Sequence, residues 1–68
     1  MLDLRNYVNN TDRVQTYRVE YSTSVQGSTF EVTLEPTQRL LDAFKKQYDD
    51  FGGLFYNIKE INSVKLID

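Results

Sequence analysis

The residue types that carry most enzyme chemistry are missing from this chain. It has no His and no Cys among its 68 residues, so the remaining candidate acids and bases are carboxylates, Lys and Tyr. Asp49 and Asp50 are adjacent carboxylates, but neighbours on a helix point about 100° apart and cannot converge on one substrate atom. A nucleophile with its base and a metal site are also lacking. We therefore expect no enzymatic activity, no cofactor and no bound metal ion.

Asp49 and Asp50 place two negative charges at the end of a predicted helix. The carboxyl end of a helix carries partial negative charge, so each unpaired carboxylate there costs about 0.3–1 kcal/mol. One interpretation is that they meet a cationic partner or a divalent ion, although a calcium loop needs further oxygen ligands at fixed spacing. The other is that Lys45 and Lys46, one turn earlier, neutralise them on a solvated face. The second interpretation is the simpler one.

Three further carboxylates, Glu20, Glu31 and Glu35, fall on the polar positions of a predicted β-hairpin, with Glu35 expected opposite Arg18. Together with Ser and Thr side chains they form one polar sheet face, which suits water or a polar partner surface. A mimic of nucleic acid would need a dense field of one sign, and the net charge of −2 is too small to supply it. Solvation is the simpler interpretation, and protein binding is the alternative.

Leu54, Phe55 and Tyr56 form an apolar triplet directly after two glycines. As core residues they need no special role. As an exposed patch they mark a partner or dimer surface, because Tyr and Phe are enriched at interfaces. Both interpretations stay open. The candidate partner-binding residues are therefore Glu20, Glu31, Glu35, Asp49, Asp50, Leu54, Phe55 and Tyr56.

Residues 16–35 alternate between apolar and polar side chains, which predicts a half-buried β-hairpin. The apolar positions are odd before Gly27 and even after it. If the chain reverses around Gln26-Gly27, Val19 faces Leu34, and the glycine supplies a residue that tolerates positive φ in the turn. Burial of one face fixes this register, because a slip of one residue would expose the entire apolar set.

Pro36 marks the predicted change from strand to helix, because proline cannot donate to a strand ladder but suits a first helical turn. With Glu35 as N-cap, Gln38 can return a hydrogen bond as in a capping box, and Thr37 is the alternative cap. The helix is predicted over residues 36–51 and ends at the two glycines that follow. One apolar stripe should cover the hairpin. It comprises Leu40, Leu41, Phe44, Tyr48 and Phe51, with Ala43 at its edge.

The two ends of the chain predict smaller elements. A final strand over residues 63–67 fits best beside the first strand and antiparallel to it, with a crossover of the usual right hand. Residues 1–13 are predicted to form a short helix or an irregular lid. The fold class is α+β, a single small domain in the order ββαβ. One helix packs on one face of a small three-stranded, mostly antiparallel sheet.

Charge and length restrict the function. The eight basic residues are dispersed and outnumbered by ten acidic ones, which argues against a nucleic-acid partner. No basic start followed by an apolar run marks a signal peptide, and no stretch approaches the ~20 apolar residues of a membrane span. We therefore expect a cytoplasmic protein without a membrane partner. A small domain without disulfides or metal buries little apolar surface, so formation of a homodimer is an expected source of stability.

By exclusion, the sequence favours a small non-enzymatic protein-binding accessory module. Such a module docks on a larger protein and inhibits or adapts it, and chains of this size and type are common in phage and other mobile-element genomes. The expected partner is another protein. The alternatives are a dimeric nucleic-acid-associated regulator and a structural assembly subunit.

Overall fold

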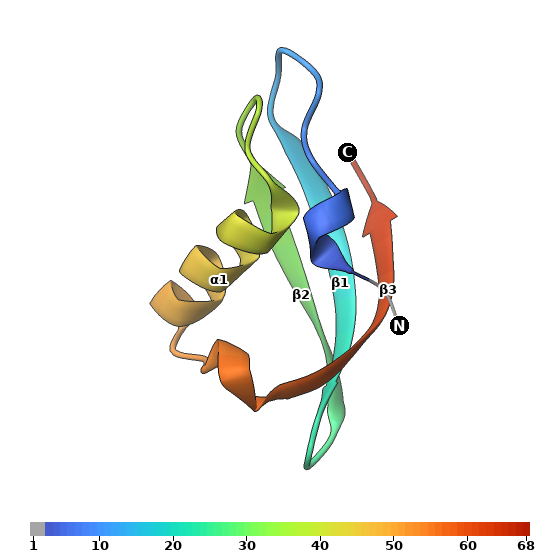
Figure 1. The fold of residues 1–68 in the computed structure, drawn as a ribbon, viewed down its shortest axis with the longest axis vertical. Coiled ribbons are helices and arrows are strands. Elements are labelled where there is room, and N and C mark those ends of the chain that lie inside the picture. The colour runs from blue at the N-terminus through green and yellow to red at the C-terminus, as the bar shows by residue number, and fades with distance from the viewer. Residues whose placement is uncertain (1–2) are drawn as a thin grey trace.

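Over residues 3–68, which the computed structural model describes, three antiparallel strands form one sheet with the order β2-β1-β3. The helix α1 packs on this sheet (Figure 1). The α+β class and the ββαβ order of the main elements are therefore confirmed. Residues 1 and 2 of the predicted N-terminal element lie outside the described residues. The elements are η1 (Leu4–Asn6), β1 (Gln15–Thr23), β2 (Gly27–Leu34), α1 (Leu40–Phe51), η2 (Phe55–Asn57) and β3 (Ile58–Leu66), where η is a 3-10 helix.

The hairpin of β1 and β2 pairs in a different register from the predicted one. Val19 lies opposite Phe30 instead of Leu34, so the predicted partners were wrong. The offset between Phe30 and Leu34 is four residues, an even number, and the side chains of a strand alternate with a period of two. Each side chain therefore keeps its predicted face, and Val19, Val32 and Leu34 are buried as expected.

The hairpin turn relies on a threonine instead of the predicted glycine. Thr23 Oγ1 accepts hydrogen bonds from the N–H groups of Val25 (3.2 Å) and Gln26 (3.3 Å). It also donates to the Gln26 carbonyl (3.1 Å). Because the hydroxyl satisfies these backbone groups, the loop needs no left-handed residue, and Gly27 lies in β2 without a positive φ. The chain reverses at Ser24 and Val25, before the predicted point.

The helix α1 begins at Leu40 and not at the predicted Pro36. The chain instead makes a tight turn after β2, closed by a hydrogen bond from Gln38 N–H to the Glu35 carbonyl (3.0 Å). Thr37 adopts a left-handed φ of 68° in this turn, which is uncommon for a β-branched residue. Gln38 Oε1 accepts from Glu35 N–H (3.0 Å), so the predicted return bond forms, but in a turn and not at a helix cap.

Pairing with the N-terminal segment explains the late start of the helix. Asn9 N–H donates to the Gln38 carbonyl (3.0 Å), and Thr37 N–H donates to the Asn9 carbonyl (2.8 Å). Leu40 N–H donates to the Tyr7 carbonyl (2.9 Å). These bonds keep the chain out of the helix until Leu40, and Tyr7 satisfies one of the N–H groups that a helix leaves free at its start.

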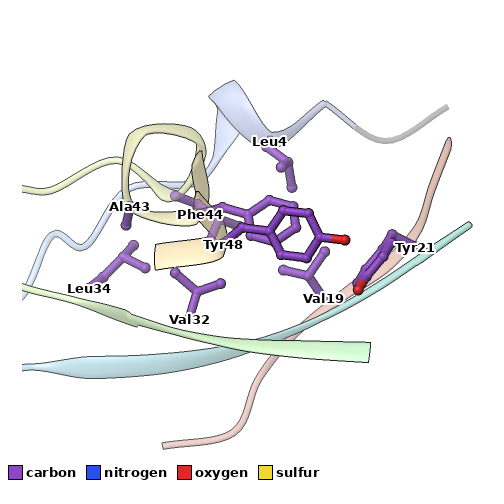
Figure 2. Packing of buried hydrophobic residues seen from close by; sticks show 9 residues of the cluster. Leu4, Val19, Tyr21, Val32, Leu34, Ala43, Phe44 and Tyr48 are labelled. Atoms are coloured by element: carbon purple, nitrogen blue, oxygen red, sulfur yellow. The ribbon is translucent and has the colours of Figure 1, made fainter. Parts of the chain in front are cut away.

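The core lies between α1 and the helix-facing side of the sheet (Figure 2). Phe44 is fully buried and contacts Tyr21 and Tyr48, with ring centroids 6.1 and 5.4 Å away. Leu4 packs on the same cluster from η1, the 3-10 turn of the N-terminal segment. The buried apolar residues are Leu4, Val19, Tyr21, Val32, Leu34, Leu40, Ala43, Phe44 and Tyr48.

The buried stripe of α1 is narrower than predicted and is centred differently. Ala43, predicted at the edge, is fully buried, whereas Leu41 is half-buried and Phe51 is 75% exposed. Residues 40, 43, 44 and 48 recur at the spacing of one helical face. Leu41 lies at the margin of this face, whereas Phe51 lies on the same face but is the last residue of the helix, where its side chain remains exposed.

The final strand β3 is longer than the predicted 63–67, and it lies beside β1 and antiparallel to it, as predicted. Ile58, Ile61 and Val64 pack against the core at intervals of three residues. This spacing arises because the pairing with β1 shifts register twice, and each shift adds one residue to β3. A strand with two such bulges lacks the period of two by which strands are recognised.

Asn9 is a fully buried polar residue that the sequence did not single out. Its Nδ2 donates to the carbonyls of Arg13 (2.8 Å) and Leu34 (3.0 Å). Its Oδ1 accepts from the backbone N–H of Thr11 (2.9 Å) and from the Thr11 hydroxyl (2.5 Å). One carboxamide therefore ties the N-terminal segment, the loop before β1 and the end of β2 together.

We expect Asn9→Ala to lower the free energy of unfolding by about 2–4 kcal/mol, because buried carbonyls lose their donor. Asn10→Ala is the matched control. Asn10 is exposed, and surface changes of this kind usually stay within about 0.5 kcal/mol. Urea unfolding of both variants measures the difference. Equal effects of the two substitutions would contradict the role assigned to Asn9.

Candidate functional site

A hollow of about 530 Å³ lies between α1 and the segment that follows it. Four charged residues of α1 form one side of this hollow, and the apolar triplet after the helix forms the other. The helix residues are spaced by three and four positions, which places them on one helical face. The lining residues are Asp42, Lys45, Lys46, Asp49, Leu54, Phe55 and Tyr56.

Two glycines position the triplet beside the helix. Gly52 adopts φ 106°, as predicted for a left-handed stop, and its N–H donates to the Asp49 carbonyl (3.0 Å). Gly53 N–H donates to the Tyr48 carbonyl (2.9 Å). A Cβ on Gly53 would lie 2.5 Å from the Tyr48 ring, so only glycine lets the chain pass this close. The chain therefore folds back and brings the triplet against α1.

The three apolar side chains of the triplet have different environments. Phe55 is half-buried, and its ring packs edge-on against Phe44 with centroids 5.6 Å apart. Lys45 Nζ lies 5.3 Å from the centre of the Phe55 ring, within the range of a cation–π contact. Leu54 is 47% exposed and Tyr56 is 78% exposed. Phe55 thus packs against the core, and its two neighbours remain at the surface.

The charged residues of α1 are only partly neutralised. Lys46 Nζ lies 3.8 Å from Asp50 Oδ2, so one of the two lysines acts as predicted. The other, Lys45, lies over the Phe55 ring. Among residues 3–68, Asp42 and Asp49 have no ion pair within 4.0 Å. The rim of the hollow therefore offers two free carboxylates beside exposed apolar side chains.

The predicted carboxylates of the sheet lie on a separate surface. Arg18 bonds to Glu31 (3.3 Å) and not to the predicted Glu35, because of the different hairpin register. Glu20 accepts a hydrogen bond from the Ser63 hydroxyl of β3. Glu35 is exposed beyond the end of β2. These carboxylates do not line the hollow, and Glu20 and Glu31 are already engaged within the sheet.

The eight predicted partner-binding residues thus divide between two places. Four of them line the hollow, namely Asp49, Leu54, Phe55 and Tyr56. Asp50 lies next to the hollow, because it pairs with Lys46, which is a lining residue. Asp42, Lys45 and Lys46 were not predicted as site residues, although their spacing with Asp49 on one helical face was a readable signal. Phe51 was assigned to the core, and it is exposed.

The chemistry that this arrangement supports is recognition. Exposed Leu and Tyr side chains bind apolar groups, and the carboxylates beside them attract basic ones. Within residues 3–68, no cluster of three or more Asp or Glu side chains is placed to hold a metal ion. The described part of the chain also has no helix of the length and apolarity that crossing a membrane requires.

Comparison with protein-family models, with curated proteins and with solved structures finds no match to this chain.

Tyr48, on the buried side of α1, provides a test of the packing beneath the hollow. The pKa of Tyr48 is raised from its ordinary 10.0 to about 12. The largest cause is hydrogen bonding with Tyr21, and the next is burial of the hydroxyl. Between these pH values the unfolded chain loses a proton that the folded chain keeps. Unfolding is therefore favoured as pH rises, and the stability linked to Tyr48 is lost between about pH 10 and pH 12.

We expect Tyr48→Phe to reduce the fall in urea midpoint between about pH 9 and pH 12, because the ionising hydroxyl is gone. Tyr56→Phe, which alters an exposed tyrosine, is the matched control and should keep the wild-type decline. Urea unfolding followed by circular dichroism at each pH measures both. A decline that is the same for all three proteins would show that Tyr48 makes no linked contribution.

Proposed function

We propose that this chain is a small non-enzymatic protein-binding module that docks on a larger protein through the hollow between α1 and η2, and so inhibits or adapts that protein. The observation that supports this most directly is the exposure of Leu54 and Tyr56 beside a core that is already closed. Phe44 and Tyr48 are buried, and the half-buried residues that pack against this core include Phe55 but neither Leu54 nor Tyr56. Apolar side chains left grouped at a surface are typical of an interaction site.

The composition of the hollow supports a protein partner. Interfaces combine an apolar centre with a polar rim, and tyrosine is enriched in them because it offers a large apolar body with one hydroxyl. Leu54 and Tyr56 supply such a centre, and Asp42 and Asp49 lie on the rim. We infer that the partner inserts an apolar side chain between Leu54 and Tyr56 and places Lys or Arg near the free carboxylates.

The alternative of a nucleic-acid-associated regulator has less support. Lys45 and Lys46, the adjacent basic pair of the sequence, contact Phe55 and Asp50. Acidic residues flank them along the same face. We therefore expect weak duplex binding without sequence preference, which a titration against mixed duplex DNA at physiological salt would measure. Submicromolar affinity for one sequence would favour the alternative.

We expect a photo-crosslinking residue at position 56 to capture one protein in the native host. Capture identifies a candidate only, so the candidate is purified and its affinity for the wild-type chain is measured. Leu54→Ala and Tyr56→Ala should each weaken binding by about tenfold or more, as truncation of interface anchors does. The proposal is wrong if both variants fold normally and bind as tightly as the wild type.

Val14→Ala is the matched control for Leu54→Ala. Both residues are aliphatic and 47% exposed, but Val14 precedes β1 and does not line the hollow. The control should change affinity by less than about twofold, because surface changes away from an interface have small effects. A loss as large as that of Leu54→Ala would place the binding surface elsewhere.

A further inference from the structure

The two edges of the sheet differ in how they are protected. An exposed edge strand carries free backbone donors and acceptors, and natural proteins block such edges with bulges, lysines or prolines. The edge strand β3 shifts register twice against β1, and it carries Lys59 and Lys65. The edge strand β2 pairs with β1 without a shift. Between Gly27 and Glu31 it has neither lysine nor proline.

The pairing of the hairpin shows which backbone groups of β2 face outward. Thr23 N–H donates to the Gln26 carbonyl at the turn, and bonded pairs in an antiparallel ladder recur every second residue. The even-numbered residues of β2 therefore bond to β1. The odd-numbered ones, Gly27, Thr29, Glu31 and Thr33, direct their N–H and carbonyl groups to the free edge.

A side chain of α1 already occupies part of this edge. Gln47 Oε1 accepts from Thr33 N–H (3.1 Å), and Gln47 Nε2 donates to the Thr33 carbonyl (2.7 Å). These are the two bonds that a neighbouring strand would make to Thr33, so the carboxamide ends the free edge there. The accessible length runs from Gly27 to Glu31. Figure 1 shows that this end of the hairpin projects beyond α1.

We propose that a second copy of the chain pairs with the free edge of β2. The two β2 strands lie antiparallel about a twofold axis at Thr29, with Gly27 of each copy opposite Glu31 of the other. Each of the three outward-facing residues then exchanges hydrogen bonds with the second copy, about six bonds in all. The two Gln47 side chains end the ladder on both sides.

The side chains of β2 are compatible with this pairing between two copies. Glu31 faces Gly27, which has no side chain, and Thr29 faces Thr29, a favourable cross-strand pair. A twofold axis at Glu31 would set two carboxylates against each other and would require Thr33, which Gln47 occupies. Only in the register centred on Thr29 do all three accessible residues of each copy pair with one another. The proposed pairing involves none of the residues of the hollow. A result against it would therefore leave the proposed function untouched, and the reverse also holds.

Sedimentation equilibrium of the full chain over a hundredfold concentration range, reaching about 1 mM, tests the association. We expect a reversible monomer–dimer equilibrium. Amide hydrogen exchange by NMR tests the surface. The amides of Gly27, Thr29 and Glu31 should become more protected as concentration rises, whereas Thr33 should be protected at every concentration. A monomer throughout, or a dimer that leaves the first three amides unprotected, overturns the proposal.

Thr29→Lys is the deciding variant, because it places two lysines opposite each other at the twofold axis. Within the monomer the new lysine faces Glu20 of β1, which favours folding. We expect the dimer to weaken by about tenfold or more. Thr33→Lys makes the same change on the same strand outside the pairing, and it should leave association unchanged. Equal effects of the two variants, or none from Thr29→Lys, overturn the proposal.

Discussion

The side chain of Asn9 is the interaction on which the arrangement of the other elements depends. Buried and bonded to both Leu34 and Arg13, it fixes the N-terminal segment against the end of β2. That segment then pairs with the chain after β2, so the helix cannot start at Pro36. With its start at Leu40, α1 turns a face that includes Ala43 to the sheet. The charged face and the hollow follow from this orientation.

Small size decides where the remaining apolar side chains go. The sheet is covered by α1 and η1 on one side, and its other side carries Arg18, Glu20 and Glu31. The domain thus has one apolar interface, and a chain of this length cannot build a second. Leu54 and Tyr56 lie outside this interface, and they remain exposed. Their grouping beside free carboxylates is what gives this surface the composition of a binding site.

Local periodicity predicted the main elements and the buried face of the hairpin, and it failed where contacts distant in sequence decide the outcome. The faces of β1 and β2 were predicted because a period of two survives any even change of register. The register depended on the hydroxyl of Thr23, which competes with glycine as a turn former. The start of α1 depended on pairing with Asn9, some 28 residues away along the chain. The bulges of β3 removed the periodic signal altogether.

The site was predicted in part for the same reason. The triplet from Leu54 to Tyr56 was recognised from its composition. The charged face of α1 that lies beside the triplet was not predicted, because the turn at Gly52 and Gly53 determines which helix face the triplet meets. That face, with Asp42 and Asp49, is separate from the free edge of β2. A partner in the hollow and a second copy on the edge therefore share no residue. A dimer that pairs through Thr29 would present two hollows. If a partner carried two matching segments, binding of the first segment would raise the effective concentration of the second at the other hollow, and the partner would bind the dimer more tightly than the monomer.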